Sequence, residues 1–199
     1  MKILLTAFEP FGGESINPAL EAVNRIKDEI RGAKIAKVEV PTSFARSFQV
    51  VKQAIDLETP DVVLMIGQAG GRDAITPERR AINLDLAKLP DNDGYIASGN
   101  KIVETAPEEY LSTLPIEKIV DAINASGVPA EISDDAGTFV CNHLFFSVLD
   151  YLAKRGTPAG FIHVPYETRQ TAKKQGVFAL PIEDIVKGIT AIVAAVVEN

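Results

Sequence analysis

Apolar residues recur along the chain with two spacings, and these spacings predict alternating strands and helices. Alternating or continuous apolar runs predict strands at residues 2–7, 34–41, 61–67, 80–88, 129–137 and 159–166. Apolar positions three to four residues apart predict helices at residues 19–30, 43–57, 115–127, 138–156 and 181–197. This order predicts an α/β fold in which helices cover both faces of a mostly parallel central sheet.

Individual residues sharpen several of these boundaries. Asn17 followed by Pro18 is a favourable N-cap and first-turn pair for the helix at 19–30, and Gly32 is a favourable stop. Ser43 can cap the following helix. The run at 61–67 is apolar at almost every position, which predicts a strand that is buried on both faces.

The chain is expected to form one domain over residues 1–199, because no linker, repeat or low-complexity tract divides it. Hydrophobic residues make up 46% and charged residues 24%, which favours a folded globular protein. The net charge of -7 and the absence of a basic run do not favour a nucleic-acid partner. The apolar stretches at both ends are too short for a signal peptide or a membrane span, which predicts a cytoplasmic protein with no membrane partner.

Cys141 is the only cysteine, which excludes an intrachain disulfide and a metal site built from cysteines. It falls in the first turn of the predicted helix at 138–156, where unpaired N–H groups and the helix dipole stabilise a thiolate. The same N–H groups can stabilise the oxyanion of a tetrahedral intermediate. From position alone, a nucleophile and a buried core residue are equally good interpretations of Cys141.

In a fold of this class the working site lies outside the carboxyl ends of the strands. The sequence therefore directs attention to the loops after Ala7, Gly67, Ser133 and Ile162. His163 lies at the last of these positions, where it interrupts an apolar strand. A core histidine with a satisfied hydrogen bond is the usual explanation for such a residue, but this place also suits a general base for a cysteine.

The spacing of two further polar residues, His143 and Glu78, bears on their roles. His143 lies two residues after Cys141, on nearly the opposite face of the helix, so we expect a structural role for it. Glu78 precedes two arginines, and spacing alone favours a surface carboxylate in an ion pair. The alternative is a carboxylate that accepts the second N–H of the His163 imidazole and fixes its tautomer.

The glycine-rich segment GQAGGR at 67–72 leaves other classes of protein open. It could bind an anion through backbone N–H groups, as a nucleoside phosphorylase would require. It lacks the Lys and Ser/Thr of a phosphate-binding P-loop, and glycines that let the backbone approach a small ligand fit equally well. A non-catalytic binding protein is a further alternative.

Four segments together resemble the pyroglutamyl peptidase I (pyrrolidone-carboxylate peptidase) family. They are TAFEPFGGESINPA at 6–19, GQAGGRDAITPERRAIN at 67–83, SDDAGTFVCN at 133–142 and GFIHVPY at 160–166. The resemblance implies a cysteine exopeptidase that hydrolyses the bond after an N-terminal pyroglutamyl residue through a thioester intermediate. It also implies an open three-layer α/β/α sandwich, no cofactor or metal, and a homotetramer.

The resemblance also assigns residues. It implies that Cys141 is the nucleophile, His163 the base and Glu78 the residue that orients the base. A pocket for the pyroglutamyl ring is implied around Phe8, Phe11 and Gln68, the substrate-binding candidates. Pyroglutamate is an uncharged lactam, so aromatic faces and a few neutral hydrogen bonds are the chemistry that such a pocket needs.

The chain departs from the family pattern at two positions. Lys88 stands where the family usually has Arg near the oxyanion site, which keeps the charge but loses the planar fork of donors. We therefore expect Lys88 at most to contribute to that site. Asp134 stands where the family often has Asn, which is expected to change only local hydrogen bonding.

Overall fold

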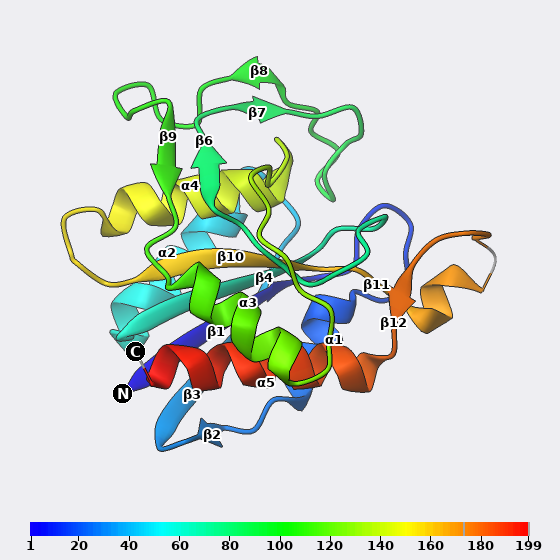
Figure 1. Cartoon of the computed structure of the whole chain (residues 1–199). Helices are drawn as coiled ribbons and strands as arrows, with labels where there is room; N and C mark the ends of the chain where they lie inside the picture. Colours follow the sequence, from blue (N-terminus) through cyan, green and yellow to red (C-terminus); the bar gives the residue numbers. More distant parts are fainter. Residues whose placement is uncertain (173, 199) are drawn as a thin grey trace.

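The centre of the molecule is a twisted sheet. The structure, a computed structural model, describes residues 1–172 and 174–198, and within them the sheet has six strands (Figure 1). Their order is β2 (Glu29–Ile30), β3 (Ala33–Val40), β1 (Lys2–Phe8), β4 (Val62–Gln68), β10 (Ala159–Val164) and β5 (Thr76–Pro77). The four central strands are parallel, and the short edge strands β2 and β5 are antiparallel to their neighbours.

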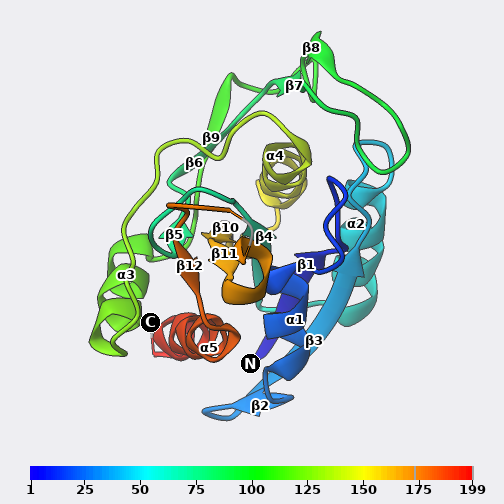
Figure 2. The same ribbon diagram turned by 90° about the vertical axis from the view of Figure 1, so that its right-hand side faces the viewer.

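Helices cover both faces of this sheet (Figure 2). One face carries α1 (Pro18–Arg25), α3 (Ile116–Ala125) and α5 (Ile182–Val197). The other carries α2 (Ser47–Glu58) and α4 (Val140–Leu152). Alternation along β1 supplies both cores, because Leu5 points into the first and Leu4 into the second. Every residue of β4 is buried, and the α/β/α sandwich is confirmed.

Short strand pairs and one short helix lie outside the central sheet. β6 (Arg80–Ile82) pairs with β9 (Glu109–Leu111), and β7 (Asp85–Leu86) pairs with β8 (Ser98–Asn100). β11 (Tyr166–Glu167) pairs with β12 (Ala179–Leu180), and the 3-10 helix η1 (Thr168–Thr171) lies between them in the chain. Sequence patterns did not predict the β11–η1–β12 segment.

The first predicted helix is wrong in its second half. Asn17 caps α1 as expected, with Oδ1 accepting from Ala19 N–H at 3.0 Å. The helix ends at Arg25, and the following residues turn outward into β2. Arg31 and Gly32 both have positive φ, so Gly32 serves the tight turn between β2 and β3 and does not terminate a helix.

The predicted strand at 80–88 is split into β6 and β7, which pair with different partners. The buried side chain of Asn83 accepts from Ile102 N–H and donates to the carbonyl of Val103, and these contacts interrupt the strand. Asn142, the neighbour of Cys141, accepts from Ile82 N–H at 2.9 Å and donates to the Ile82 carbonyl at 2.9 Å. Asn142 therefore takes the place of a neighbouring strand.

Three other boundaries differ from the prediction. The second helix begins at Ser47, and Ser43 accepts a bond from Arg46 N–H in the preceding turn. The region 129–137 makes isolated bridges, including one between Glu78 and Ser133, in place of a strand. The loop after Ser133 therefore does not follow a strand of the sheet. The helix predicted at 138–156 is shorter, because α4 runs from Val140 to Leu152.

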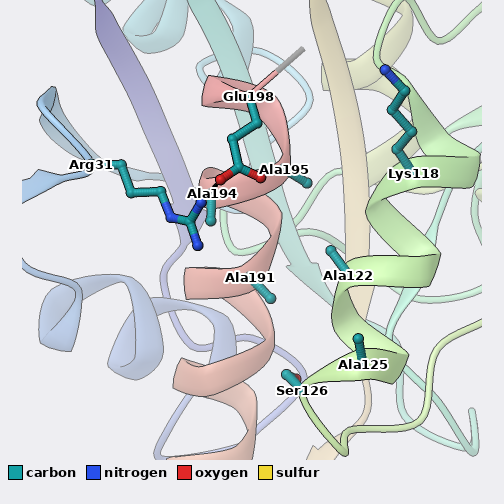
Figure 3. A pocket seen from close by; sticks show the side chains of 9 residues that line it. All are labelled: Arg31, Lys118, Ala122, Ala125, Ser126, Ala191, Ala194, Ala195 and Glu198. Atoms are coloured by element: carbon teal, nitrogen blue, oxygen red, sulfur yellow. Dashed lines mark ion pairs between the residues drawn. The ribbon is translucent and has the colours of Figure 1, made fainter.

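A groove of about 500 Å³ lies between α3 and α5 (Figure 3). Alanines line most of it, with Arg31 paired to Glu198 on one side and Lys118 on the other. The groove lies on the sheet face opposite α4 and includes neither the cysteine nor a histidine. Within residues 1–172 and 174–198, each helix is too short or too polar to span a membrane.

Candidate active site

Cys141 lies in the first turn of α4, with Phe139 as the N-cap residue of that helix. Its side chain is 9% exposed and belongs to the core cluster on this sheet face. A Cβ atom placed on Gly67 would lie 3.2 Å from Cys141 Sγ and 2.7 Å from the ring of Phe161. Glycine at the end of β4 therefore lets the strand and the thiol approach each other.

Strand register places His163 on the sheet face that carries the thiol. Within the sheet it is opposite Gly67 on one side and Thr76 on the other. Its Nδ1 donates to Glu78 Oε1 at 2.6 Å, and both side chains are buried. Since Nδ1 is occupied, Nε2 is the nitrogen that remains for the thiol.

Glu78 is fully buried, so the surface ion pair favoured by its spacing is wrong. Its backbone N–H donates to the carbonyl of Phe161 at 2.8 Å, which docks the segment after β5 against β10. Besides His163, Arg72 donates to Glu78 Oε1 at 2.6 Å. The structure thus joins His163 to Glu78, and strand register places His163 on the sheet face that carries Cys141. A Cys-His-acid set of these three residues stays a prediction.

Sequence analysis missed Arg72 as part of this cluster. Its guanidinium also bonds Thr76 and donates to the carbonyl of Asp135 at 2.7 Å. Arg72 therefore joins the glycine-rich loop, Glu78 and the loop before Cys141. Its spacing from Glu78 gives no periodic signal, and only its place in the loop GQAGGR marked it in the sequence.

Burial decides the resting charge state of the pair. It raises the pKa of the Cys141 thiol to about 12, and the negative charge of Glu78 acts in the same direction. Burial also lowers the pKa of His163, against the hydrogen bond and the charge of Glu78, which raise it. The thiol of Cys141 and the imidazole of His163 are therefore both neutral near pH 7, and the helix N-terminus does not maintain the thiolate that the sequence suggested.

Glu78 itself remains ionised. Burial raises the pKa of Glu78, but the interaction with His163, followed by those with Ser133 and with the charge of Arg72, lowers it by more, so the net pKa lies below its usual value. Among residues 1–172 and 174–198, Glu78 Oε2 has no hydrogen-bond partner, so Oε1 accepts both bonds. An ionised acceptor on Nδ1 holds the imidazole in the tautomer that leaves Nε2 as a base.

His143 has the structural role expected from its spacing. Its Nδ1 bonds Asp85 Oδ2 at 2.8 Å, and its ring packs edge-on against Phe44 at 5.6 Å between centroids. These contacts lie on the side of α4 that faces β7, away from β10. His143 fixes the hairpin of β7 and β8 to the helix and is not part of the Cys141 cluster.

Phe11 and Lys88 line a cavity of about 340 Å³ at the start of α4. Thr138 and Phe139 form its side nearest Cys141, and the Phe11 and Phe139 rings lie 6.2 Å apart. The residues that line the cavity are mostly apolar or aromatic, and the charged residue among them is Lys88. The cavity is large enough for a small ring, and its wall includes Phe139, the N-cap residue of the helix that carries Cys141.

Phe8 and Gln68 occupy different surroundings from Phe11. Phe8 is 2% exposed and packs against Phe161 at 6.4 Å between ring centroids, and Phe161 in turn packs against His163. Phe8 therefore supports the site through Phe161. Gln68 ends β4 and does not lie in a loop, and its side chain bonds Gln170. Gly67 directs its missing Cβ toward Cys141, so alternation sends the Gln68 side chain to the opposite face of the sheet.

The glycine-rich loop packs against protein atoms. A Cβ placed on Gly70 would lie 2.1 Å from the ring of Tyr166, so this glycine permits close contact with an aromatic side chain. That contact accounts for Gly70 without a phosphate. Asp134, at the second departure from the family pattern, accepts from Arg79 Nε at 2.7 Å. Among the described residues, no cluster of three or more His, Cys, Asp or Glu side chains could hold a metal ion.

Comparison with protein families gives a match over the entire chain. The family model described as pyroglutamyl peptidase matches residues 1–199. The pyrrolidone-carboxylate peptidase of Lactobacillus johnsonii is 48% identical over 202 residues, which cover 100% of this chain and 94% of the relative. That of Streptococcus pyogenes is 48% identical over 100% of this chain and 93% of its own length.

Solved structures of similar proteins superpose closely. Pyroglutamyl peptidase I from Bacillus amyloliquefaciens has a TM-score of 0.97 and 42% identity, with 100% of this chain and 95% of that chain covered. Pyrrolidone carboxyl peptidase from Thermococcus litoralis has a TM-score of 0.95 and 35% identity, with coverage of 99% and 93%. The resemblance found in the four sequence segments therefore extends over the fold.

Proposed function

The chain belongs to the pyroglutamyl peptidase family, cysteine omega peptidases that remove N-terminal pyroglutamate, and we propose that Cys141, His163 and Glu78 perform this reaction. The observation that carries the assignment is the buried 2.6 Å bond from His163 Nδ1 to Glu78, because His163 pairs in the sheet with Gly67, whose missing Cβ leaves room for Cys141 Sγ. This arrangement supplies a nucleophile, a base and a group that orients the base.

The first step forms a thioester. His163 Nε2 takes the proton of the Cys141 thiol as the sulfur attacks the carbonyl carbon between pyroglutamate and the next residue. Because the resting thiol and imidazole are both neutral, proton transfer accompanies the attack. The C–N bond then breaks, the amine leaves with the proton from His163, and the pyroglutamyl group remains on sulfur.

The second step restores the enzyme. Water gives a proton to His163 and adds to the thioester carbonyl, the C–S bond breaks, and the proton returns to the thiolate as free pyroglutamate leaves. In both steps negative charge develops on the carbonyl oxygen. The first turn of α4 offers N–H groups without intrahelical acceptors for this charge, and Lys88, which lines the cavity at the start of α4, is the candidate for a further cation.

Lactam recognition is assigned to the cavity that Phe11 lines and to the end of β4. Ala69 N–H donates to the Val164 carbonyl, so the odd residues at this end of β4 face β10 and Gln68 faces β1. The register between β1 and β4 ends at Ala7 and Ile66. The backbone N–H and C=O of Gln68 therefore lie beyond the ladder, where they can pair with the lactam C=O and N–H.

Such pairing would distinguish pyroglutamate from proline. Proline lacks the lactam carbonyl, so it would leave the buried N–H that pairs with that carbonyl without a partner. The Gln68 backbone would therefore select the lactam by hydrogen bonding, and the aromatic cavity wall would select the shape of the ring. Phe8 acts indirectly, by supporting Phe161 beneath the site.

Location and assembly follow the family resemblance. We propose a cytoplasmic homotetramer, and the free thiol of Cys141 is consistent with a reducing compartment. Sedimentation of the purified protein tests the assembly directly. A particle with the mass of one or two chains at working concentration would contradict the tetramer.

The activity is tested by release of a fluorescent amine from a pyroglutamyl conjugate, with the matching prolyl conjugate beside it. We expect the pyroglutamyl compound to be hydrolysed and the prolyl compound to react at least about 10³-fold more slowly, because its ring leaves the Gln68 N–H unpaired. Complete alkylation of the single thiol by iodoacetamide should abolish turnover. Equal rates for the two compounds would contradict the proposed recognition, and activity that survives alkylation would contradict the role of Cys141.

A further inference from the structure

Gln170 lies where three parts of the chain meet behind the active site. It belongs to η1 between β11 and β12 and is 8% exposed. Its side chain contacts its own segment, the loop that precedes α1 and the end of β4. The catalytic steps described above do not use it.

Fixed neighbours set the orientation of the Gln170 amide. Its Oε1 accepts from the backbone N–H of Glu167 at 3.0 Å, in a capping box at the start of η1. Its Nε2 donates to the carbonyl of Ile16 and to Glu14 Oε2, each at 3.4 Å. A backbone N–H only donates, and a carbonyl or carboxylate only accepts, so the amide has one satisfactory orientation.

This orientation determines what Gln170 presents to Gln68. Its Nε2 donates to Gln68 Oε1 at 3.2 Å in a buried contact. The Gln68 side chain is thus held on the sheet face opposite Cys141, while its backbone lies at the open end of β4. Holding the side chain limits the rotation of the Gln68 peptide groups, which have no ladder partner on the β1 side to fix them.

We propose that Gln170 is a positioning residue for lactam recognition. By holding the Gln68 side chain, it keeps the Gln68 backbone N–H and C=O at the spacing and direction that a pyroglutamyl ring requires. The inference rests on the proposed function, because it takes the Gln68 backbone as the group that binds the lactam. It adds a residue from the β11–η1–β12 segment to the determinants of specificity.

A neighbouring ion pair provides a matched control. Lys174 bonds Glu14 Oε1 at 2.6 Å and lies 3.9 Å from the centre of the Tyr166 ring. It therefore links the same two loops as Gln170 without touching Gln68. We expect a variant at Lys174 to loosen the segment and to keep the Gln170–Gln68 bond, in which Lys174 takes no part.

The test compares steady-state kinetics on the fluorogenic pyroglutamyl conjugate. Gln170→Met keeps the length of the side chain and removes both hydrogen-bonding groups. We expect KM to rise about three- to tenfold, the effect of one or two neutral hydrogen bonds, with kcat within about twofold. The rate of Cys141 alkylation should not change, and Lys174→Met should leave KM within about twofold of the parent protein.

Gln68→Met breaks the same bond from the other side and serves if Gln170→Met does not fold. It should raise KM by a similar factor, and the double variant should be no worse than either single variant. Unchanged KM in both single variants, an equal rise in Lys174→Met, or additive effects in the double variant would each overturn the inference. If the parent protein itself does not hydrolyse the conjugate, the proposed function fails; parent activity with normal KM in both variants rejects only the role of Gln170.

Discussion

Replacing Cys141 by alanine is expected to lower kcat/KM for a pyroglutamyl conjugate by about four orders of magnitude or more. The thiol lies in the first turn of α4 and faces Gly67 near the end of β4. Without it, the thioester cannot form, and what remains is binding and oxyanion stabilisation. Progress curves recorded at high concentration of the variant protein measure the residual rate.

The fold should survive this substitution. Cys141 Sγ makes no hydrogen bond among those found in residues 1–172 and 174–198, so loss of the sulfur removes packing and no polar partner. We expect the free energy of unfolding to fall by about 1 kcal/mol, the cost of a small buried group. Cys141→Ala protein with a normal circular dichroism spectrum and more than a few per cent of the parent rate would refute the nucleophile assignment.

Glu78→Gln is expected to slow kcat by about 10² to 10⁴-fold, less than the loss of Cys141. The amide keeps the shape of the side chain but removes the charge that holds the His163 tautomer and stabilises the imidazolium as it forms. It also presents Arg72 with a neutral partner in place of an ionised one. Steady-state kinetics over a range of pH measures both the plateau rate and the position of the acid limb.

The Glu78→Gln substitution should move the acid limb of the pH–rate profile, the range in which activity falls as pH is lowered, in a defined direction. His163 must be neutral to act as base, and burial already lowers its pKa below the ordinary value of 6.5, so the parent enzyme keeps activity below that pH. The Glu78 bond and charge raise the pKa of His163, so their removal lowers it and shifts the limb to lower pH. A shift to higher pH would contradict the assignment.

A control for Glu78→Gln comes from an exposed carboxylate on the same side of the molecule. Glu109 pairs with Arg80 at 2.8 Å and is about half exposed. Glu109→Gln removes one surface ion pair, which is worth little, and should leave the pH profile unchanged. If both variants move the acid limb equally, a long-range charge effect replaces the specific role of Glu78.

The local sequence was sufficient for the central strands because their burial pattern is set by their own residues. β4 is buried at every position, and its continuous apolar run predicted that result. Elements held by distant side chains could not be predicted in this way. β6 and β7 separate because Asn83 and Asn142 bond backbone groups that a continuous strand would use, and neither bond has a periodic signature.

In the site, too, local patterns predicted some residues, whereas tertiary contacts determine the others. Position at the carboxyl end of a strand marked His163, and position in a first helical turn marked Cys141. Glu78 is buried because its loop docks on Phe161, so its spacing beside arginines was misleading. Arg72 and Gln170 depend on loop–loop contacts, which no pattern along the chain encodes.

The charge state of the thiol also needed the structure. A helix N-terminus favours a thiolate, but burial in a core cluster opposes it, and no pattern along the chain measures which effect prevails. The raised pKa of Cys141 shows that burial prevails. Alkylation of the free enzyme should therefore quicken as pH rises above neutrality, without an early plateau.

Mass spectrometry of enzyme quenched during turnover shows directly whether Cys141 carries the pyroglutamyl group. Glu78→Gln protein mixed with excess pyroglutamyl conjugate and stopped in acid should carry one added pyroglutamyl group, located on the peptide that contains Cys141. Hydroxylamine should remove the group, as expected for a thioester. We expect this adduct in Glu78→Gln protein and none in Cys141→Ala protein. Turnover without any adduct on Cys141, or an adduct on another residue, would contradict the role of Cys141 as nucleophile.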